Sequence, residues 1–383
     1  MLAQAKRDSS GKCRRGHTVN RHPKRWRLRV WVPVAVMVAG AGLVAPIGAA
    51  PVAAAAKTSE FAYVTSAATD TVVVIDTITN TVTGTIAVGD EPTGVAITSD
   101  GRRAYVTNAG ADTVSVIDTV ARSVTATIAV GDKPTDVAVT PDGRRAYVTN
   151  EKSGTVSVID ASNAVVATID VRNDPSDRPT DVAITPNGAR AYVTNFRSSV
   201  SVIDTATNAV VTTITEGLGQ EPVAVAITPD GTRAYVAVHF SIRVAVIDIA
   251  SNTVIKSIAV KEEPTDVAIT PDGARAYVTV PFGTLQKPPV VQVINTVTNT
   301  VTNNIAAGDY PTDVAITPDG TRGYVTNANS DTVWVLDIAT NTFTTTIPAG
   351  TSIRAGGVAI ARVTITPSPR RPGVRNSNNN NNG

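Results

Sequence analysis

The chain has 383 residues, of which 42% are hydrophobic but only 4% are aromatic. This length exceeds the usual size of one hydrophobic core, so it favours an architecture that grows by adding repeated units. Lys and Arg (34) nearly balance Asp and Glu (32), but ten basic residues and one acid lie in the first 56 positions, which leaves the rest near −7. Because phosphate binding needs a clustered basic surface, this balance argues against a nucleic-acid partner.

Residues 1–56 have the layout of an export signal peptide. A basic run precedes an apolar run at 30–50, and an Ala-x-Ala site follows at 54–56. The alternative is an uncleaved anchor, since about 20 apolar residues can span a bilayer. Pro33 and Pro46 interrupt the run and favour cleavage. We therefore expect an extracytoplasmic protein, secreted or at the cell surface, with no membrane span after cleavage and without Cys13, the only cysteine.

One unit, PTDVAVTPDGRRAYVTN at 134–150, recurs along almost the whole remaining chain. Its tyrosine recurs at intervals of 42 to 47 residues, at Tyr63, Tyr105, Tyr147, Tyr192, Tyr235, Tyr277 and Tyr324. A period of this size, built from short β-type runs, is typical of a propeller in which each repeat forms one four-stranded blade. Within the unit we expect strands at 137–140, 146–149, 156–160 and 164–169, with a Pro-Asp-Gly turn after the first.

The two ends of the repeat array predict how the ring closes. The first-strand motif occurs seven times, but the array opens with an AYVT strand at 62–65 and ends with a lone first strand at 358–360. That last copy lacks the usual turn, so we expect it to pair beside 62–65 and leave no free edge. The prediction is an all-β, seven-bladed propeller over residues 57–365, followed by a disordered Pro/Arg/Asn-rich tail at 366–383.

The repeats resemble the YVTN-type β-propeller family, whose name is spelled at 105–108, 147–150, 192–195 and 324–327. This resemblance implies an exported or surface-layer protein with a binding role, and it transfers no catalytic residues. The expected partner is an unknown protein, glycan or small molecule at the cell envelope, bound by a monomer without a cofactor.

The loops that depart from the repeat cluster in three consecutive blades on one face, the one that carries the loops from second to third strand. Phenylalanines and basic residues replace small polar residues there, which motivates a binding-patch hypothesis. The alternative is that these loops vary freely and their rings only cover a neighbouring blade. The residues of this predicted patch are Phe196, Arg197, His239, Phe240, Arg243, Phe282 and Lys287.

Four carboxylates stand at the start of the predicted innermost strands, at Asp136, Asp181, Asp266 and Asp313. The same position holds Gly94, Ala224 and Gly357 in the other blades. A cation such as calcium at the channel mouth is one interpretation. Carboxylates spread around a ring are too far apart to share one ion, so we favour solvated or backbone-capping roles and predict no metal site.

Catalysis has little support in the sequence. His239 is the only histidine after residue 56, so neither a histidine metal cluster nor more than one Ser-His-Asp arrangement is available. A non-catalytic binding scaffold is therefore the main hypothesis. The alternative is a lactonase-like hydrolase or lyase around His239, with glutamates in nearby connections at Glu216, Glu221, Glu262 and Glu263.

Overall fold

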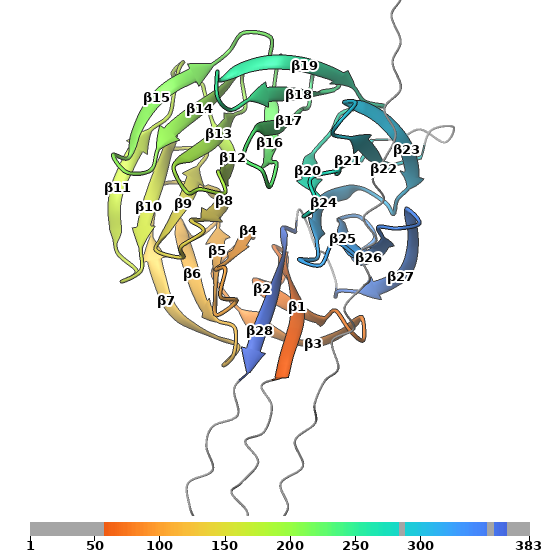
Figure 1. Ribbon diagram of the computed structural model, residues 1–383. Helices are drawn as coiled ribbons and strands as arrows, with labels where there is room; N and C mark the ends of the chain where they lie inside the picture. The colour runs from red at the N-terminus through yellow and green to blue at the C-terminus, as the bar shows by residue number, and fades with distance from the viewer. Residues whose placement is uncertain (1–56, 283–287, 351–355, 366–383) are drawn as a thin grey trace, which may run out of the picture. The chain divides into compact units, whose positions relative to one another are not determined.

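A computed structural model describes residues 57–282, 288–350 and 356–365 of the chain. These residues form 28 strands in seven antiparallel sheets of four, which surround a central axis (Figure 1). The predicted seven-bladed propeller is therefore confirmed. None of the described residues forms a helix with the length and apolarity that a bilayer crossing requires. The predicted signal peptide and tail lie outside the described residues.

Each blade is named here in order from its innermost to its outermost strand. Blade 1 consists of β28 (Val358–Ile365), β1 (Lys57–Ser66), β2 (Thr71–Asp76) and β3 (Thr81–Ala87). Blade 2 consists of β4 (Pro92–Ile97), β5 (Arg103–Asn108), β6 (Thr113–Asp118) and β7 (Ser123–Ala129). Blade 3 consists of β8 (Pro134–Val139), β9 (Arg145–Asn150), β10 (Thr155–Asp160) and β11 (Val165–Asp170). Blade 4 consists of β12 (Pro179–Ile184), β13 (Arg190–Asn195), β14 (Ser199–Asp204) and β15 (Ala209–Ile214).

The remaining blades follow the same order. Blade 5 consists of β16 (Pro222–Ile227), β17 (Arg233–Val238), β18 (Arg243–Asp248) and β19 (Thr253–Ala259). Blade 6 consists of β20 (Asp266–Ile269), β21 (Arg275–Val280), β22 (Val290–Asn295) and β23 (Thr300–Ala306). Blade 7 consists of β24 (Pro311–Ile316), β25 (Arg322–Asn327), β26 (Thr332–Asp337) and β27 (Thr342–Pro348).

The ring closes where the two ends of the repeat array meet. Strand β28 pairs antiparallel with β1, and the register places Val358 opposite Val64 and Ile360 opposite Ala62. This is the pairing expected from the missing turn. The ladder extends further than the sequence indicated, to Lys57 opposite Ile365, because β28 continues where the other inner strands turn. Closure in this way pairs the inner edge of β1, which would otherwise be exposed.

The loops divide between two faces of the ring. On the top face, the loop that enters a blade lies against the loop between its second and third strands, as where the His239 N–H donates to the Glu221 carbonyl at 2.7 Å. The bottom face carries the Pro-Asp-Gly turns, as expected. In one of them the Thr140 hydroxyl and the Arg144 N–H both donate to Asp142 Oδ1, at 2.6 and 3.1 Å.

Residues that recur from one repeat to the next join neighbouring blades. The hydroxyl of buried Tyr147 donates to Asn208 Oδ1 in the next blade at 2.8 Å, and Arg145 donates to the Thr205 carbonyl of that blade at 2.6 Å. Because a buried hydroxyl needs a partner, the tyrosine couples blade packing to a specific turn. The same tyrosine bond joins Tyr192 to Asn252, Tyr235 to Asn299, Tyr277 to Asn341 and Tyr324 to Asn80.

The threonine and asparagine of the YVTN motif also have structural partners. In blade 3, Thr149 Oγ1 lies 2.9 Å from Thr135 Oγ1 and donates to the Thr180 carbonyl of blade 4 at 3.3 Å. The Asn150 amide donates to Thr155 and Ser157 of its own blade at 3.1 and 2.9 Å. The motif that identifies the repeat therefore builds the scaffold, and function must lie where blades differ.

Candidate functional site at the top face

The central channel opens on the top face as a cavity of about 370 Å³. Its lining residues lie at or near the starts of the inner strands. Figure 1 shows these strands arranged around the axis of the ring. All four carboxylates singled out in the sequence line it, and so do the glycines and the alanine that replace them in the other blades. Thr93, Thr135, Thr265 and Thr312 add hydroxyl groups to the wall, while Val223 makes one side apolar.

Each channel aspartate binds the backbone of the next blade. Asp181 Oδ2, for example, accepts the Val225 N–H at 2.6 Å, and Asp313 Oδ2 accepts the Val358 N–H at 2.8 Å across the closure. The other two follow the same rule, Asp136 with Val182 at 3.3 Å and Asp266 with Val314 at 2.9 Å. These bonds cap backbone N–H groups, which is one of the roles expected for the four aspartates from the sequence.

The four carboxyls form two adjacent pairs, Asp136 with Asp181 and Asp266 with Asp313. Burial raises the pKa of Asp136 well above its usual range, and the neighbouring Asp181 raises it further. Burial likewise raises the pKa of Asp266, with Asp313 as the second cause, and burial raises the pKa of Asp313. A neighbouring carboxylate disfavours a second negative charge, so it adds to the effect of burial on Asp136 and Asp266. Across the described part of the chain, no three His, Cys, Asp or Glu side chains gather closely enough to hold one metal ion.

Beside the channel mouth, the ring of Phe282 contacts one ring from each of two other blades. His239 of blade 5 contacts Phe282 of blade 6 edge-to-face, with ring centroids 5.8 Å apart. Phe282 in turn contacts Tyr310 of blade 7 at 5.5 Å, and Tyr310 also lines the channel mouth. Phe282 is 40% exposed. We call His239, Phe282 and Tyr310 the aromatic cluster.

The imidazole of His239 has an acidic neighbour in the next blade. Its Nε2 lies 3.9 Å from Glu263 Oε2, while its buried Nδ1 has no hydrogen-bond partner among the described residues. A catalytic histidine is normally oriented by hydrogen bonds of about 2.6 to 3.2 Å, so this contact is an ion-pair distance rather than an orienting bond.

The other described residues of the predicted patch, Phe196, Arg197, Phe240 and Arg243, lie on the same face but do not join the aromatic cluster. Phe196 and Phe240 are exposed by 36% and 62%. Arg197 instead donates to Ser176 at 2.5 Å and pairs with Asp174 at 3.4 Å. Arg243 donates weakly to Ser257 at 3.4 Å. Lys287 lies outside the described residues.

Tyr310 is not among the site residues predicted from the sequence. It precedes the proline that begins an inner strand, a position held by Glu91, Lys133 and Glu221 in other blades, and all four adopt a left-handed φ of 49 to 61°. The shared conformation belongs to the repeat, and only the side chain is unusual. A signal was available in the sequence, because Tyr310 is the one aromatic residue among these four.

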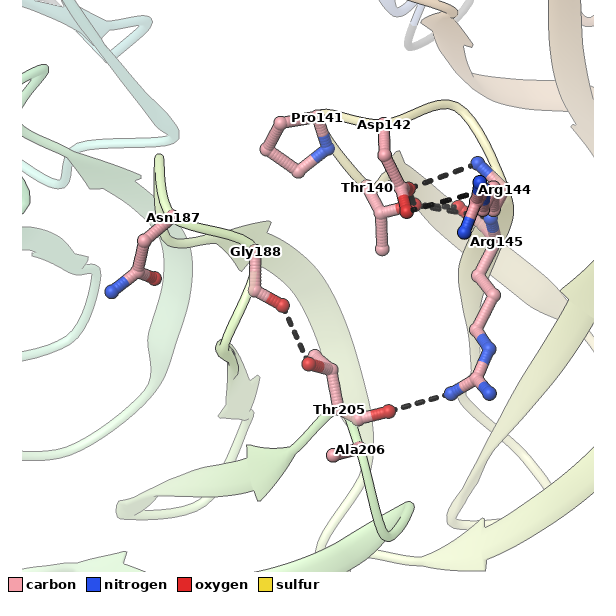
Figure 2. A pocket seen from close by; sticks show the side chains of 9 residues that line it. All are labelled: Thr140, Pro141, Asp142, Arg144, Arg145, Asn187, Gly188, Thr205 and Ala206. Carbon is pink, nitrogen blue, oxygen red and sulfur yellow. Dashed lines mark hydrogen bonds and ion pairs between the residues drawn. The ribbon is translucent and has the colours of Figure 1, made fainter.

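Cavities on the bottom face have a different origin. One of about 370 Å³ lies between blades 3 and 4, where Arg145 reaches the Thr205 carbonyl and the Thr205 hydroxyl donates to the Gly188 carbonyl (Figure 2). Similar cavities of about 380 and 300 Å³ occur between blades 5 and 6 and between blades 7 and 1. Because equivalent residues line them and are engaged in joining blades, these cavities are a product of the repeat.

Comparisons with known proteins support a propeller family. A family model described as "Choice-of-anchor I domain" matches residues 111–262, and one described as "Lactonase, 7-bladed beta-propeller" matches residues 56–165. No curated protein matches the chain. Each family match covers less than half of the chain, and the lactonase match contains neither His239 nor Glu263.

Several solved structures share the fold. Hydrazine synthase of Kuenenia stuttgartiensis is 25% identical, with a TM-score of 0.62 over 71% of this chain and 95% of that chain. A protein of unknown function from Desulfotomaculum acetoxidans is 20% identical, with a TM-score of 0.66 over 79% and 99%. A candidate 6-phosphogluconolactonase of Bacteroides fragilis is 16% identical, with a TM-score of 0.65 over 79% and 98%. At such identities the last two report the fold alone.

Proposed function

We propose that this chain is a YVTN-type propeller that acts outside the cytoplasm as a non-catalytic binding module. Its recognition surface is the top face over blades 5 to 7, centred on the aromatic cluster. The observation that carries the proposal is the contact of three rings from three blades beside an open channel, in a chain with 4% aromatic residues. Exposed aromatic anchors next to a polar cavity are typical of recognition sites. The extracytoplasmic location rests on the sequence of residues 1–56.

The charge of the surface favours one kind of partner. The described residues that line the channel mouth include four aspartates and no lysine or arginine. Arg197, which the sequence analysis assigned to the patch, is engaged with Asp174 and Ser176. A partner that presents positive charge and apolar surface therefore fits this face better than an anionic small molecule does.

Phe282→Ala tests the recognition surface. It removes the central ring of the aromatic cluster, so we expect retention of the partner to fall at least about fivefold, the effect of losing one interface anchor. Immobilised wild-type and variant proteins would be exposed to an envelope fraction of the producing cells, and the retained species quantified. Ile78→Ala is the matched control, because Ile78 is an apolar side chain exposed by 66% on the bottom face. Equal retention by both variants would refute the proposed surface.

A lactonase-like hydrolase is the second candidate, because a seven-bladed lactonase model matches part of the chain. The matched residues do not reach His239, so the match gives no support to a catalytic role for the only histidine after residue 56. We expect a spectrophotometric screen of sugar lactones and uronate-type substrates to give no turnover above background. Turnover that His239→Asn abolishes would establish the enzyme and displace the binding proposal.

A further inference from the structure

The two carboxyl pairs of the channel mouth face each other across the axis of the ring. Asp136 and Asp181 lie near the starts of β8 and β12, and Asp266 and Asp313 lie near the starts of β20 and β24. Figure 1 shows β8 and β12 on one side of the ring and β20 and β24 on the other. One cavity of about 370 Å³ is lined by both pairs, so a single ligand can contact both.

The wall between the two pairs is not acidic. On one side of the channel, blade 5 contributes the apolar side chains of Val223 and Ala224, and on the other side blades 1 and 2 contribute glycines. The threonine hydroxyls of the wall are bonded to the protein itself, as where Thr135 Oγ1 donates to the Thr180 carbonyl at 2.9 Å. The cavity therefore has two acidic ends joined by an apolar wall.

The carboxylates have capacity for a ligand. Asp313 Oδ2 accepts one backbone N–H, that of Val358, and an ionised carboxylate has about four lone-pair sites. The described residues of the wall include no lysine or arginine, although a buried charge is normally paired. After burial, which is the largest cause, Asp181 of the opposite pair also raises the pKa of Asp266 and Asp313. A positive ligand between the pairs would relieve this repulsion.

The arrangement selects the kind of cation. Within the described ranges, no three His, Cys, Asp or Glu side chains gather closely enough to hold one metal ion. A ligand with a single positive charge neutralises only one pair. A chain of methylene groups with an ammonium group at each end reaches both pairs, and its carbon atoms can pack against Val223. Each ammonium group would form charge-assisted hydrogen bonds, which are stronger than bonds between neutral groups.

We propose that the channel mouth binds an aliphatic diamine or polyamine. One ammonium group lies at Asp136 and Asp181, a second lies at Asp266 and Asp313, and the carbon chain lies along Val223. The inference rests on the proposed binding function and names a ligand class for the same face. It does not require the aromatic cluster, so its failure and the failure of the recognition surface are separate results.

Calorimetric titration of the intact protein at neutral pH tests the ligand class. The probes are putrescine, cadaverine and spermidine, with butylamine as the monoamine that has the carbon chain of putrescine and one ammonium group. Because a hydrogen bond to a charged group contributes enough free energy for about a tenfold change in affinity, we expect at least one of the three probes to bind about tenfold or more tightly than butylamine.

A channel variant tests the position of the ligand. Asp266→Asn/Asp313→Asn removes the charge of one pair, and each asparagine keeps an acceptor for the backbone N–H that the aspartate binds. We expect the affinity of the tightest probe to fall about tenfold or more, to the level of butylamine. Asp142→Asn/Asp230→Asn is the matched control, because it removes two carboxylates from bottom-face turns. This control and Phe282→Ala are expected to bind the probe as wild type does.

The ligand comparison and the variants each decide the proposal. Equal affinities of wild type for butylamine and all three probes would overturn it, and so would a channel variant that binds as tightly as wild type or a turn variant that binds as weakly as the channel variant. Should the channel variant not fold, the comparison of ligands on wild type still decides. A failed titration together with loss of partner retention in Phe282→Ala would remove the diamine and leave the recognition surface in place.

Discussion

Replacing Gly101 with alanine is expected to destabilise the propeller by about 1 to 3 kcal/mol more than the same change at Gly143. Both glycines lie in bottom-face turns with nearly equal φ, +71° and +69°, so both alanines incur the same left-handed cost of about 1 to 2 kcal/mol. A Cβ at Gly143 meets only the Thr98 side chain, at 3.9 Å. At Gly101 it would overlap the Arg362 carbonyl oxygen of β28, so the closing strand must shift.

Urea unfolding of wild type, Gly101→Ala and Gly143→Ala measures this difference, provided that the slope of the transition stays the same. Because the backbone conformation is matched, the excess loss at Gly101 reports the position of β28 against the turn between β4 and β5. Equal losses in the two variants would mean that the final strand does not lie there, and the ring would have to close in another way.

The pairing of β28 with β1, which closes the ring, could be predicted from the sequence because it follows from counting the strand motifs. Every first strand except the last is followed by a turn, and the chain opens with a strand that lacks its partner. The positions of the strand ends were predicted less accurately. The inner strand of blade 3 was expected at 137–140 and is found at Pro134–Val139, because the pairing of Pro134 with Asn150 extends the ladder past a register shift.

The candidate site was only partly predictable, because it depends on contacts between blades. Along the top face, the residue after one blade's second strand meets the residue before the next blade's proline. Examples are Glu151 with Arg178 at 3.6 Å and His239 with Glu263 at 3.9 Å. The repeat pattern places these residues on one face, but it does not say which side chains touch. The repeat pattern therefore does not predict the contact between Phe282 and Tyr310, which are 28 positions apart in the chain.

The same limitation explains why the ion pair and hydrogen bond of Arg197 could not be predicted from the sequence. Its position in a loop with Phe196 suggested a ligand-facing cation. The inserted 171–178 loop supplies Asp174 and Ser176 as partners, and those contacts arise from an insertion about 20 residues earlier in the chain. Sequence variation marks the loop that carries Phe196 and Arg197 as unusual, whereas its contacts with residues 174–176 depend on the packing of two separate loops.

The double variant Asp136→Asn/Asp266→Asn is expected to be more stable than wild type at neutral pH, by on the order of 1 kcal/mol or more. Burial and a neighbouring carboxyl raise the pKa of both residues in the folded state, while an aspartate in the unfolded chain titrates near 3.9. A raised pKa means that the folded state holds the proton more tightly. The stability that this tighter proton binding contributes is complete below about pH 4, and it is lost as the pH rises through the pKa of the folded state.

An asparagine keeps the acceptor for the next blade's N–H and can donate to Asp181 or Asp313 without a bound proton. The advantage of the double variant over wild type should therefore grow as the pH rises from 4 to 8, measured by urea unfolding at each pH. The informative quantity is the difference in unfolding free energy between the two proteins. The carboxyls of the bottom-face turns are present in both proteins, and their effect on stability changes with pH in the opposite sense. The Thr140 hydroxyl lowers the pKa of Asp142, for example, so its contribution is lost on acidification.

Asp142→Asn/Asp230→Asn is the control for this pH dependence. The pKa values of both turn carboxyls are lowered, first by the hydroxyls of Thr140 and Thr228, so this variant should lose stability relative to wild type as the pH rises above 4. A channel variant whose advantage does not change with pH would show that the channel carboxyls are not protonated in the folded ring. In the other three blades, the position of the channel aspartate is occupied by Gly94, Ala224 or Gly357. The fold therefore does not require the aspartates of the other four blades, and the repulsion within each pair is a cost to its stability.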